Sequence, residues 1–336
     1  MKKTSSSRRP AKARQERPDL YQQVTDNIIG AIERGTLPWR KPWRTDRNRV
    51  YTGSVMPQNG TTGYHYSGVN VLLLWIAAEE RGFHSNRWLT YKQAEAVGGH
   101  VRAGETATLA VVFKPWDKQV EDADGRQLFD EEGKPLKTRI PMLKPLYLFN
   151  VAQCDNLPEI VVGVMPATET DEGEALVDAK KQAQVNTLVE ACGVQIEQVY
   201  QDRAFYSPLR DRIVLPQAQQ FRTEADYWST LLHELVHSTG HATRLNREGI
   251  TSSSRRFGDP VYAFEELVAE LGSAFMCAQL GVFGDIQHDS YLEHWLRVLR
   301  EDKRALFRAA KQAREASEFL LKPLADPVTT DPAVAA

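Results

Sequence analysis

Apolar side chains recur along the chain at the spacing of amphipathic helices. In residues 20–35, Val24, Ile28 and Ile32 fall on one side of such a helix, and Gly35 marks its end. A short helix with Thr90 as its N-cap is predicted within 87–97, after a turn. The remaining predicted helices cover 70–81, 175–192, 221–240, 261–280 and 290–311.

Shorter apolar stretches bounded by turn residues predict strands. Residues 109–113 and 143–151 form one such pair, and the acidic, glycine-containing segment 117–137 between them is predicted to be a hairpin loop. Three more short strands are predicted at 194–199, 204–206 and 211–215. Helices and strands in this order, without an internal repeat, predict an α+β fold.

The length of the chain, 336 residues, suggests two domains of ordinary size. A segment with two prolines and a run of acids, residues 156–172, is the predicted linker between them. The predicted organisation is a disordered basic tail at 1–18, a first domain at 19–155, a second domain at 173–323 and a flexible tail at 324–336.

Composition is that of a globular protein, with 42% apolar and 26% charged residues. We find no apolar stretch long enough to cross a bilayer and no signal-peptide pattern in the first residues, so no membrane partner is expected. The three cysteines, Cys154, Cys192 and Cys277, lie far apart without CxxC spacing. This usage argues against a disulfide framework and predicts a cytoplasmic protein.

The net charge of −2 conceals a basic N-terminal region. Residues 1–17 carry seven lysines and arginines against one acid, and a second basic cluster lies between Arg34 and Arg49. Such an asymmetry favours a nucleic-acid partner for the first domain. The alternative for residues 1–17 is a solvated tail without a ligand.

The segment His233-Glu234-Leu235-Val236-His237 predicts a metal site. Residues four apart lie on one face of a helix, so both imidazoles can bind one ion, while Glu234 stands beside it as the general base. The predicted cofactor is Zn²⁺, with another divalent ion such as Mn²⁺ as the alternative. Two histidines on an ordinary helix face are the competing interpretation.

A catalytic zinc usually takes three protein ligands and keeps a fourth position open. Glu266 is the predicted third ligand, because it lies on the core-directed face of the helix at 261–280. Glu270 lies on the same face and is expected to contact His233 or His237 without binding the metal itself. Glu265 is offset by about 100° and could equally be exposed to solvent, or serve as an alternative ligand. His241 follows the helix-ending Gly240, so it is expected to support the site or to serve as an alternative ligand. Arginines such as Arg255 are the competing partners of the acids on the helix at 261–280.

Aromatic and basic side chains alternate in the first domain. Single-stranded nucleic acid is bound by this mixture, since bases stack on rings while lysine and arginine contact phosphates. The alternative is that Trp39 and Trp88 simply belong to the core. The candidate DNA-binding residues are Trp39, Arg40, Lys41, Trp43, Arg44, Tyr64, Tyr66, Asn70, Arg87, Trp88 and Lys92.

The sequence resembles the ArdC-type antirestriction proteins, which are related to TraC-like primases of conjugative plasmids. The matching segments span roughly residues 20–285 and comprise PWRKPW (38–43), YSGVN (66–70), RWLTYKQA (87–94), GGHVRAGE (98–105), LLHELVHSTGH (231–241) and YAFEELVAELGSAFMCAQLG (262–281). The resemblance implies a single-stranded-DNA-binding domain followed by a zincin-like metallopeptidase domain. It also implies His233 and His237 as metal ligands and Glu234 as general base.

Two functional hypotheses follow from the residues and the resemblance together. In the first, the protein binds single-stranded DNA, protects incoming plasmid DNA from host restriction, and cleaves a protein bound to that DNA. In the second, it protects DNA by occlusion alone, and the metal centre is structural or vestigial. A nucleotidyl-transfer or nuclease activity has no support, because we find neither a clustered Asp-x-Asp site nor a GxxxxGK[ST] loop. The oligomeric state stays open.

Overall fold

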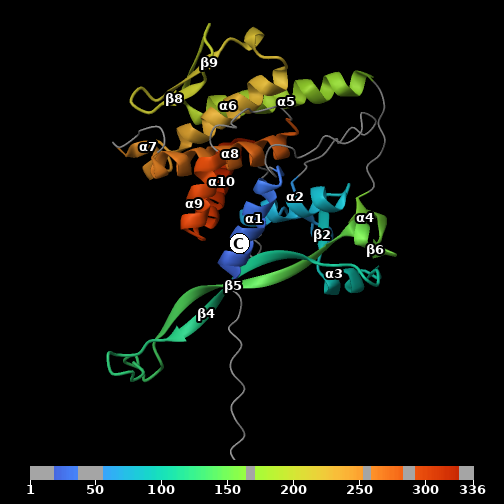
Figure 1. Cartoon of the computed structure of the whole chain (residues 1–336), viewed down its shortest axis with the longest axis vertical. Helices are drawn as coiled ribbons and strands as arrows, with labels where there is room; N and C mark the ends of the chain where they lie inside the picture. Colours follow the sequence, from blue (N-terminus) through green and yellow to red (C-terminus); the bar gives the residue numbers. More distant parts are fainter. Residues whose placement is uncertain (1–18, 37–55, 164–170, 253–258, 283–291, 325–336) are drawn as a thin grey trace, which may run out of the picture.

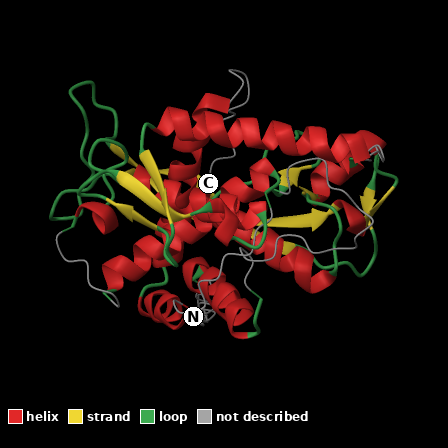
Figure 2. Cartoon of the chain, turned by 90° about the horizontal axis from the view of Figure 1, so that it is seen from above, coloured by secondary structure: helices red, strands yellow, loops and turns green. Residues whose placement is uncertain are grey.

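The computed structural model of the chain describes residues 19–36, 56–163, 171–252, 259–282 and 292–324. Helices and strands are both present in the described residues, and most of the strand pairs are antiparallel, which confirms the α+β class. Seen from above, helices fill the middle of the molecule and strands lie on both sides of them (Figure 2). The helices are α1 (Leu20–Glu33), α2 (Val69–Arg81), α3 (Tyr91–Ala96), α4 (Glu159–Val162), α5 (Asp171–Cys192), α6 (Glu224–Thr239), α7 (Glu248–Thr251), α8 (Pro260–Leu280), α9 (Leu292–Glu301) and α10 (Ala305–Leu321).

The strands form three sheets. A four-stranded sheet in the first half has the order β1-β2-β5-β4, a pair β3-β6 lies beside it, and a three-stranded sheet in the second half has the order β7-β9-β8. The strands are β1 (Gln58–Asn59), β2 (Arg87–Leu89), β3 (His100–Val101), β4 (Thr108–Gln119), β5 (Lys137–Asn150), β6 (Cys154–Asp155), β7 (Gln195–Val199), β8 (Phe205–Ser207) and β9 (Arg212–Pro216).

Helix α6 begins and ends where its sequence provides capping groups. The Thr223 side chain accepts from the Asp226 backbone, and the Asp226 side chain accepts from the Thr223 backbone, which forms a capping box. Gly240 follows the last helical residue. The helix therefore has a defined start and end, and its residues 231–239 are all buried.

Helix α8 lies across α6 and is almost wholly buried. Asp259 caps its N-terminus, Pro260 occupies the first turn, and Gly281 ends it in the left-handed conformation. Gly272 brings the two helices close, because a Cβ there would meet Val236 Cγ1 at 2.9 Å. The small residue thus sets the distance between the two helices that carry the candidate metal ligands.

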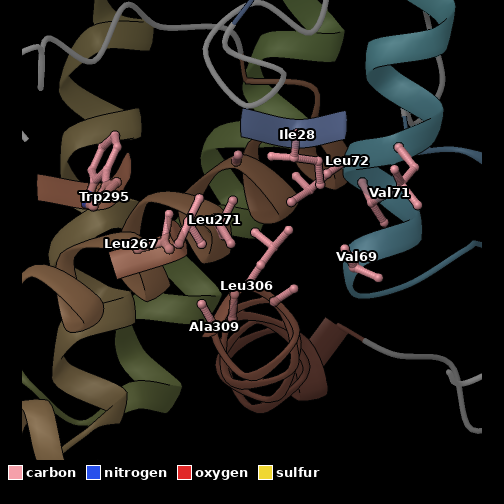
Figure 3. Packing of buried hydrophobic residues seen from close by; sticks show 14 of the residues in the cluster. Ile28, Val69, Val71, Leu72, Leu267, Leu271, Trp295, Leu306 and Ala309 are labelled. Carbon is pink, nitrogen blue, oxygen red and sulfur yellow. The ribbon is translucent and has the colours of Figure 1, made fainter. Parts of the chain in front are cut away.

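One apolar core joins the two halves of the chain. It contains Ile28 of α1, Leu72 of α2 and Val111 of β4 together with Leu271 of α8 and Leu306 of α10. Figure 3 shows side chains of these helices meeting in a single packed layer. The first and second halves therefore stabilise each other directly.

Asn70 ties α2 to the long hairpin. Its side-chain amide donates to Val111 O at 2.8 Å, and its side-chain oxygen accepts from Val111 N at 2.8 Å. Both groups are buried, so the paired hydrogen bonds replace the water that these polar atoms would otherwise contact. Asn70 thus positions strand β4 relative to the shared core.

Several predicted boundaries are corrected by the structure. Strands β4 and β5 are longer than predicted and pair from Thr108–Leu148 out to Gln119–Lys137, so the hairpin loop is shorter than 117–137. Residues 87–89, predicted as a turn, form β2. Most of the side chains on the outer hairpin are exposed on both faces, which removes the apolar alternation that identifies a strand.

The helix predicted at 290–311 is two helices. α9 ends at Glu301, and α10 begins at Ala305 and continues to Leu321. Between them the Asp302 side chain accepts from the Arg304 backbone at 2.8 Å and forms a turn. A short aspartate that binds its own backbone competes with helical hydrogen bonding, and the apolar spacing alone does not reveal this.

Part of the predicted linker at 156–172 is folded. α4 lies within it, and Arg87 donates to the backbone oxygens of Ile160 and Val161. Val161 is buried against the first half of the chain. The predicted tail at 1–18, the predicted tail at 324–336 except for Leu324, and the segment 164–170 lie outside the described residues. Among the helices that are described, none has the length and apolarity of a membrane span.

Candidate metal centre

Helix α6 presents two imidazoles side by side. His233 and His237 are one helical turn apart, and their ring centroids are 4.8 Å apart with planes at 80°. Their exposed fractions are 2% and 7%. Two imidazoles held this close and away from bulk solvent could supply two ligands of a metal site.

Helix α8 supplies a carboxylate that faces both imidazoles. Glu266 Oε2 lies 3.7 Å from His233 Nε2, and Glu266 Oε1 lies 3.5 Å from His237 Nε2. The three residues can each offer one ligand atom such that all of these atoms lie within 4.8 Å of one another. Ligand atoms about 2.0–2.2 Å from a tetrahedral zinc stand roughly 3.3–3.6 Å apart. The spacing of these side chains therefore fits a divalent ion and leaves a position for a further ligand.

Two more glutamates of α8 contact the opposite nitrogens of the imidazoles. Glu265 Oε1 lies 3.3 Å from His237 Nδ1, and Glu270 Oε2 lies 3.5 Å from His233 Nδ1. Each contact favours the tautomer in which Nδ1 carries the proton and Nε2 is free to bind an ion. The prediction that Glu265 could be exposed is wrong, since it is 2% exposed.

Arg247 is the residue of this centre that the sequence does not reveal. It donates from Nη2 to Glu265 Oε1 at 2.6 Å and from Nε to Glu265 Oε2 at 3.0 Å. It also donates to Thr239 Oγ1 at 2.6 Å and Val236 O at 2.7 Å. This guanidinium neutralises Glu265 and fixes its direction towards His237. No periodic pattern marks Arg247, which precedes a single helical turn.

The Glu234 carboxylate lies beside the imidazoles with one oxygen unused. Its Oε2 is buried and has no hydrogen-bond partner among the described residues. Burial raises the pKa of Glu234, although the neighbouring histidines and the Tyr206 backbone amide act in the opposite direction. A buried carboxylate oxygen without a partner costs free energy, so this atom is suited to a ligand that the protein itself does not supply.

The carboxylates and imidazoles of the cluster shift one another's pKa values. Burial alone would lower the pKa of His237, but the charge of Glu266 and the contact with Glu265 raise it to about 9. For His233, burial is likewise outweighed by Glu266 and Glu270, and the pKa rises well above its ordinary value. Burial opposes ionisation of Glu266, yet the imidazoles hold the pKa of this carboxyl well below its usual range. A divalent ion held by His233, His237 and Glu266 would take the place of the protons that these groups share.

His241 lies apart from the three candidate ligands. Its Nδ1 contacts Thr243 Oγ1 at 2.8 Å and accepts from the Thr243 backbone at 3.3 Å. The cluster of candidate ligand atoms found among the described residues comprises His233, His237 and Glu266. The role of His241 as an alternative ligand is therefore corrected: after Gly240 ends the helix, the chain turns it towards its own loop.

The structure divides the candidate DNA-binding residues into three groups. Trp39, Arg40, Lys41, Trp43 and Arg44 lie outside the described residues. The accessible candidates are Tyr64, which is half-buried, and Lys92, which is exposed.

The remaining candidates support the fold. Tyr66, Asn70 and Trp88 have exposed fractions of 4%, 3% and 1%. Arg87 is engaged with the α4 backbone. The DNA-contact prediction is corrected for Tyr66, Asn70 and Trp88, because a ring packed in the core cannot stack on a base and the Asn70 amide is already used.

Comparisons with known proteins agree with this arrangement. Residues 18–149 match the family described as the N-terminal domain of anti-restriction factor ArdC, and residues 183–312 match a zincin-like metallopeptidase family. The chain is 35% identical over 309 residues to a DNA primase TraC of Escherichia coli and spans 27% of that protein's length. It is 34% identical to an uncharacterized protein, y4eC, of Sinorhizobium fredii, and covers 91% of it.

Solved structures show the same fold. The metal-free crystal structure of the antirestriction ArdC protein from the R388 plasmid matches with a TM-score of 0.71 and 37% identity, over 91% of this chain and 97% of that one. The Mn(II)-bound structure of the same protein matches with a TM-score of 0.68, over 92% and 99% of the two chains. The chain therefore belongs to the ArdC family of antirestriction proteins and carries an ArdC-type N-terminal domain followed by a zincin-like metallopeptidase domain.

Proposed function

We propose that this protein binds single-stranded DNA, protects it from restriction, and uses a metal-dependent peptidase site on α6 and α8. The observation that carries the peptidase proposal is the position of His233, His237 and Glu266 around one point, with Glu234 next to them. The ion is proposed to be divalent, Zn²⁺ or Mn²⁺, and a related ArdC structure holds Mn(II). When bound, such an ion supplies Lewis acidity for hydrolysis of an amide bond.

The side chains of the site have different proposed roles in hydrolysis. Glu265 and Glu270 contact the two imidazoles at Nδ1, so that each Nε2 would be left free to bind the ion. Glu234 is the proposed general base, and its Oε2, which has no partner among the described residues, would accept the proton of the attacking water. Burial raises the pKa of Glu234, which makes its carboxylate a better acceptor of that proton.

Single-strand binding rests on charge and on family membership. Basic side chains cluster in residues 1–17 and between Arg34 and Arg49. These clusters match what a phosphate backbone requires, and the family's first domain is the part of the chain that carries the second of them. Binding along the strand would shield it from a restriction enzyme without any need for proteolysis. The substrate of the peptidase site is proposed to be a protein bound to the same DNA.

A structural role for the metal is the second candidate. The observation that favours it is burial: His233, Glu234, His237 and Glu266 are between 2% and 7% exposed. Against it, a structural zinc is usually closed by four protein ligands and has no use for a neighbouring base. The two candidates differ in whether Glu234 affects protection.

The Glu234→Gln variant separates the two candidates. The amide keeps the size of the side chain but cannot accept a proton at the same atom, so metal and single-strand binding should stay unchanged. Transfer of an unmodified plasmid into a restricting host is then compared for wild type, Glu234→Gln and His237→Ala. A loss of protection in Glu234→Gln supports proteolysis as the protective step. Full protection by Glu234→Gln would remove peptidase chemistry from this role and leave DNA binding as its basis.

A further inference from the structure

Strands β4 and β5 form a long arm that projects from the body of the protein (Figure 1). Twelve residue pairs join them, from Thr108–Leu148 to Gln119–Lys137. Only the first pairs lie against the core, and the chain from Lys114 to Lys118 is exposed. A two-stranded ribbon with no sheet packed on its outer part gains little stability from burial, so its surface is available for a ligand.

The register of the hairpin sorts its side chains onto two faces. Residues directly opposite each other in an antiparallel pair project to the same side, and the side alternates along the strand. One face of the outer hairpin therefore carries Val112, Lys114, Trp116, Lys118, Thr138, Ile140, Met142 and Lys144. We call this surface the lysine face.

The lysine face has positive charge and no carboxylate. Its charged residues are Lys114, Lys118 and Lys144, and no ion pair is recorded for them among the described residues. The opposite face instead holds Asp117, which Arg139 contacts at 3.2 Å. Lys137 lies on the opposite face as well, so that face has two basic residues and one acid, whereas the lysine face has three lysines and no acid. The lysine face is therefore the better complement to a polyanion.

An exposed ring lies between the lysines. Trp116 is 49% exposed, opposite Ile140, which is 37% exposed. At about 3.3 Å per residue, Lys114 and Lys118 are roughly 13 Å apart along the strand, with Trp116 midway. A flat apolar ring flanked by cations is the combination that single-stranded nucleic acid uses, with bases on the ring and phosphates at the lysines.

The tip of the hairpin limits the surface. It contains the acids Glu121, Asp122, Asp124, Asp130, Glu131 and Glu132. Two of these, Asp122 and Asp130, accept backbone hydrogen bonds that form its turns. Negative charge at the tip repels phosphates, so a bound strand would cross the lysine face between the core and the tip.

We propose that the lysine face binds single-stranded nucleic acid. The assignment rests on the proposed single-strand binding of this protein and gives it a defined site, distinct from the basic clusters of the N-terminal sequence. Trp116 stacks on a base, and Lys114, Lys118 and Lys144 contact consecutive parts of the backbone. The metal centre takes no part in this contact.

A matched pair of double variants tests the face. Lys114→Ala/Lys118→Ala removes two charges from the lysine face, and Lys137→Ala/Arg139→Ala removes two charges from the opposite face of the same hairpin. Affinity for a fluorescein-labelled oligothymidylate is measured by anisotropy in the full-length protein at several salt concentrations. The first variant should bind about ten-fold or more weakly, with the slope of log K against log salt reduced by about 1.4, since each phosphate contact contributes ~0.7. The control should bind within about three-fold of wild type.

Trp116 variants test stacking separately from charge. Trp116→Ala should weaken binding at least five-fold, while Trp116→Phe should recover part of the loss, because a base also stacks on phenylalanine. Thermal melting of each variant checks that the fold is kept. A change confined to self-association would assign the face to a second copy of the chain and overturn the proposal.

The outcomes also separate this proposal from the proposed function. Wild-type protein without affinity for the oligonucleotide would overturn both. Wild-type binding that is equally lost, or equally kept, in the two double variants would overturn the lysine face alone. The single-strand function would then rest on other parts of the chain.

Discussion

The buried pair of Arg247 and Glu265 is the residue-scale feature on which the geometry of His237 depends. Glu265 contacts both the guanidinium and His237 Nδ1, and Arg247 also donates to the α6 backbone at Val236 O. Burial of two charges is costly, so such a pair persists only with good geometry and satisfied hydrogen bonds. Here the arginine donates five hydrogen bonds, three to Glu265, one to Thr239 Oγ1 and one to Val236 O.

Removing Arg247 should strongly destabilise the protein. Arg247→Ala leaves Glu265 buried without its countercharge, which should lower the free energy of unfolding by about 3–5 kcal/mol. Arg300→Ala is the control, because its pair with Glu33 has side chains 57% and 48% exposed. That change should cost at most about 1 kcal/mol. Urea unfolding of both variants measures the difference, and equal losses would show that burial does not determine the strength of the pair.

At this scale the sequence predicts those parts of the site that follow helical spacing. His233, Glu234 and His237 are fixed by the i, i+4 rule, and Glu266 and Glu270 by the core-directed face of α8. Glu265 could not be placed, because an angle around a helix axis does not say whether another element covers that side. Arg247 covers this side of the helix, and it lies in a loop whose apolar residues have no periodic spacing.

The crossing of α6 and α8 is the element-scale feature that brings the ligands together. Gly272 lies at the contact, and a Cβ there would approach Val236 Cγ1 to 2.9 Å and Val236 Cγ2 to 3.0 Å. Both methyl groups of Val236 are held in the packed core, so a Cβ at position 272 would force the two helices apart. A separation of a few tenths of an ångström moves Glu266 away from the imidazoles.

Gly272→Ala should therefore be destabilising although alanine favours helices. We expect a loss of about 1–3 kcal/mol from overpacking, together with weaker metal binding. Gly30→Ala in α1 is the matched control, because its Cβ would meet only the movable end of Arg34 at 3.1 Å. That change should be neutral or stabilising by up to ~1 kcal/mol. The melting temperatures of both variants measure the difference. A Gly272→Ala protein that is more stable than wild type would contradict the tight crossing of α6 and α8.

Helices could be predicted from the sequence where one face is buried and the other is exposed. α1, α2, α6 and α8 carry apolar faces against a core, and their predicted ranges agree with the structure to within a few residues. The outer hairpin is exposed on both faces, so its strands leave no alternating signal. The break between α9 and α10 depends on a local side-chain hydrogen bond of Asp302, which competes with an otherwise helical pattern.

The whole molecule is organised around a core that the two halves of the chain share. Helices α1 and α2 pack with α8, α9 and α10, so each half buries part of its apolar surface only against the other. Further apolar clusters lie within one half. Sequence patterns mark which residues are apolar but not which distant segments meet. The chain therefore matches two families, an ArdC-type domain and a zincin-like domain. Because these two parts share a core, we expect them to unfold together.

The shared core predicts that damage in the first half destabilises the metal centre in the second. Ile28→Ala in α1 should cost about 2–5 kcal/mol, because Ile28 is fully buried. Ile160→Ala, at an 82% exposed position, should change stability by less than about 0.5 kcal/mol. Urea unfolding of the Mn²⁺-loaded protein, followed by tryptophan fluorescence and by metal release, should give one coincident transition that shifts in Ile28→Ala. Two separate transitions would contradict a single core.

The stability of chelator-treated protein should depend on pH. The pKa of His237 is raised to about 9, above its ordinary value near 6.5. A group whose pKa is raised on folding stabilises fully below the unfolded value, and this stabilisation is lost as pH rises through the folded value. The melting temperature should therefore fall between about pH 6.5 and 9 without metal, and added Mn²⁺ should restore it most at the alkaline end. A melting temperature that is constant over this range would contradict the coupling of His237 to the carboxylates.

Titration of the chelator-treated protein with Mn²⁺ by calorimetry tests most directly whether His233, His237 and Glu266 hold a divalent ion. Wild type, Glu234→Gln and His241→Ala should each bind one ion per chain with similar affinity, because neither changed residue is a ligand. Glu266→Gln should bind about 100-fold more weakly or not measurably, since it removes the only carboxylate ligand proposed. Unchanged binding in Glu266→Gln, or loss of binding in His241→Ala, would contradict the site as described.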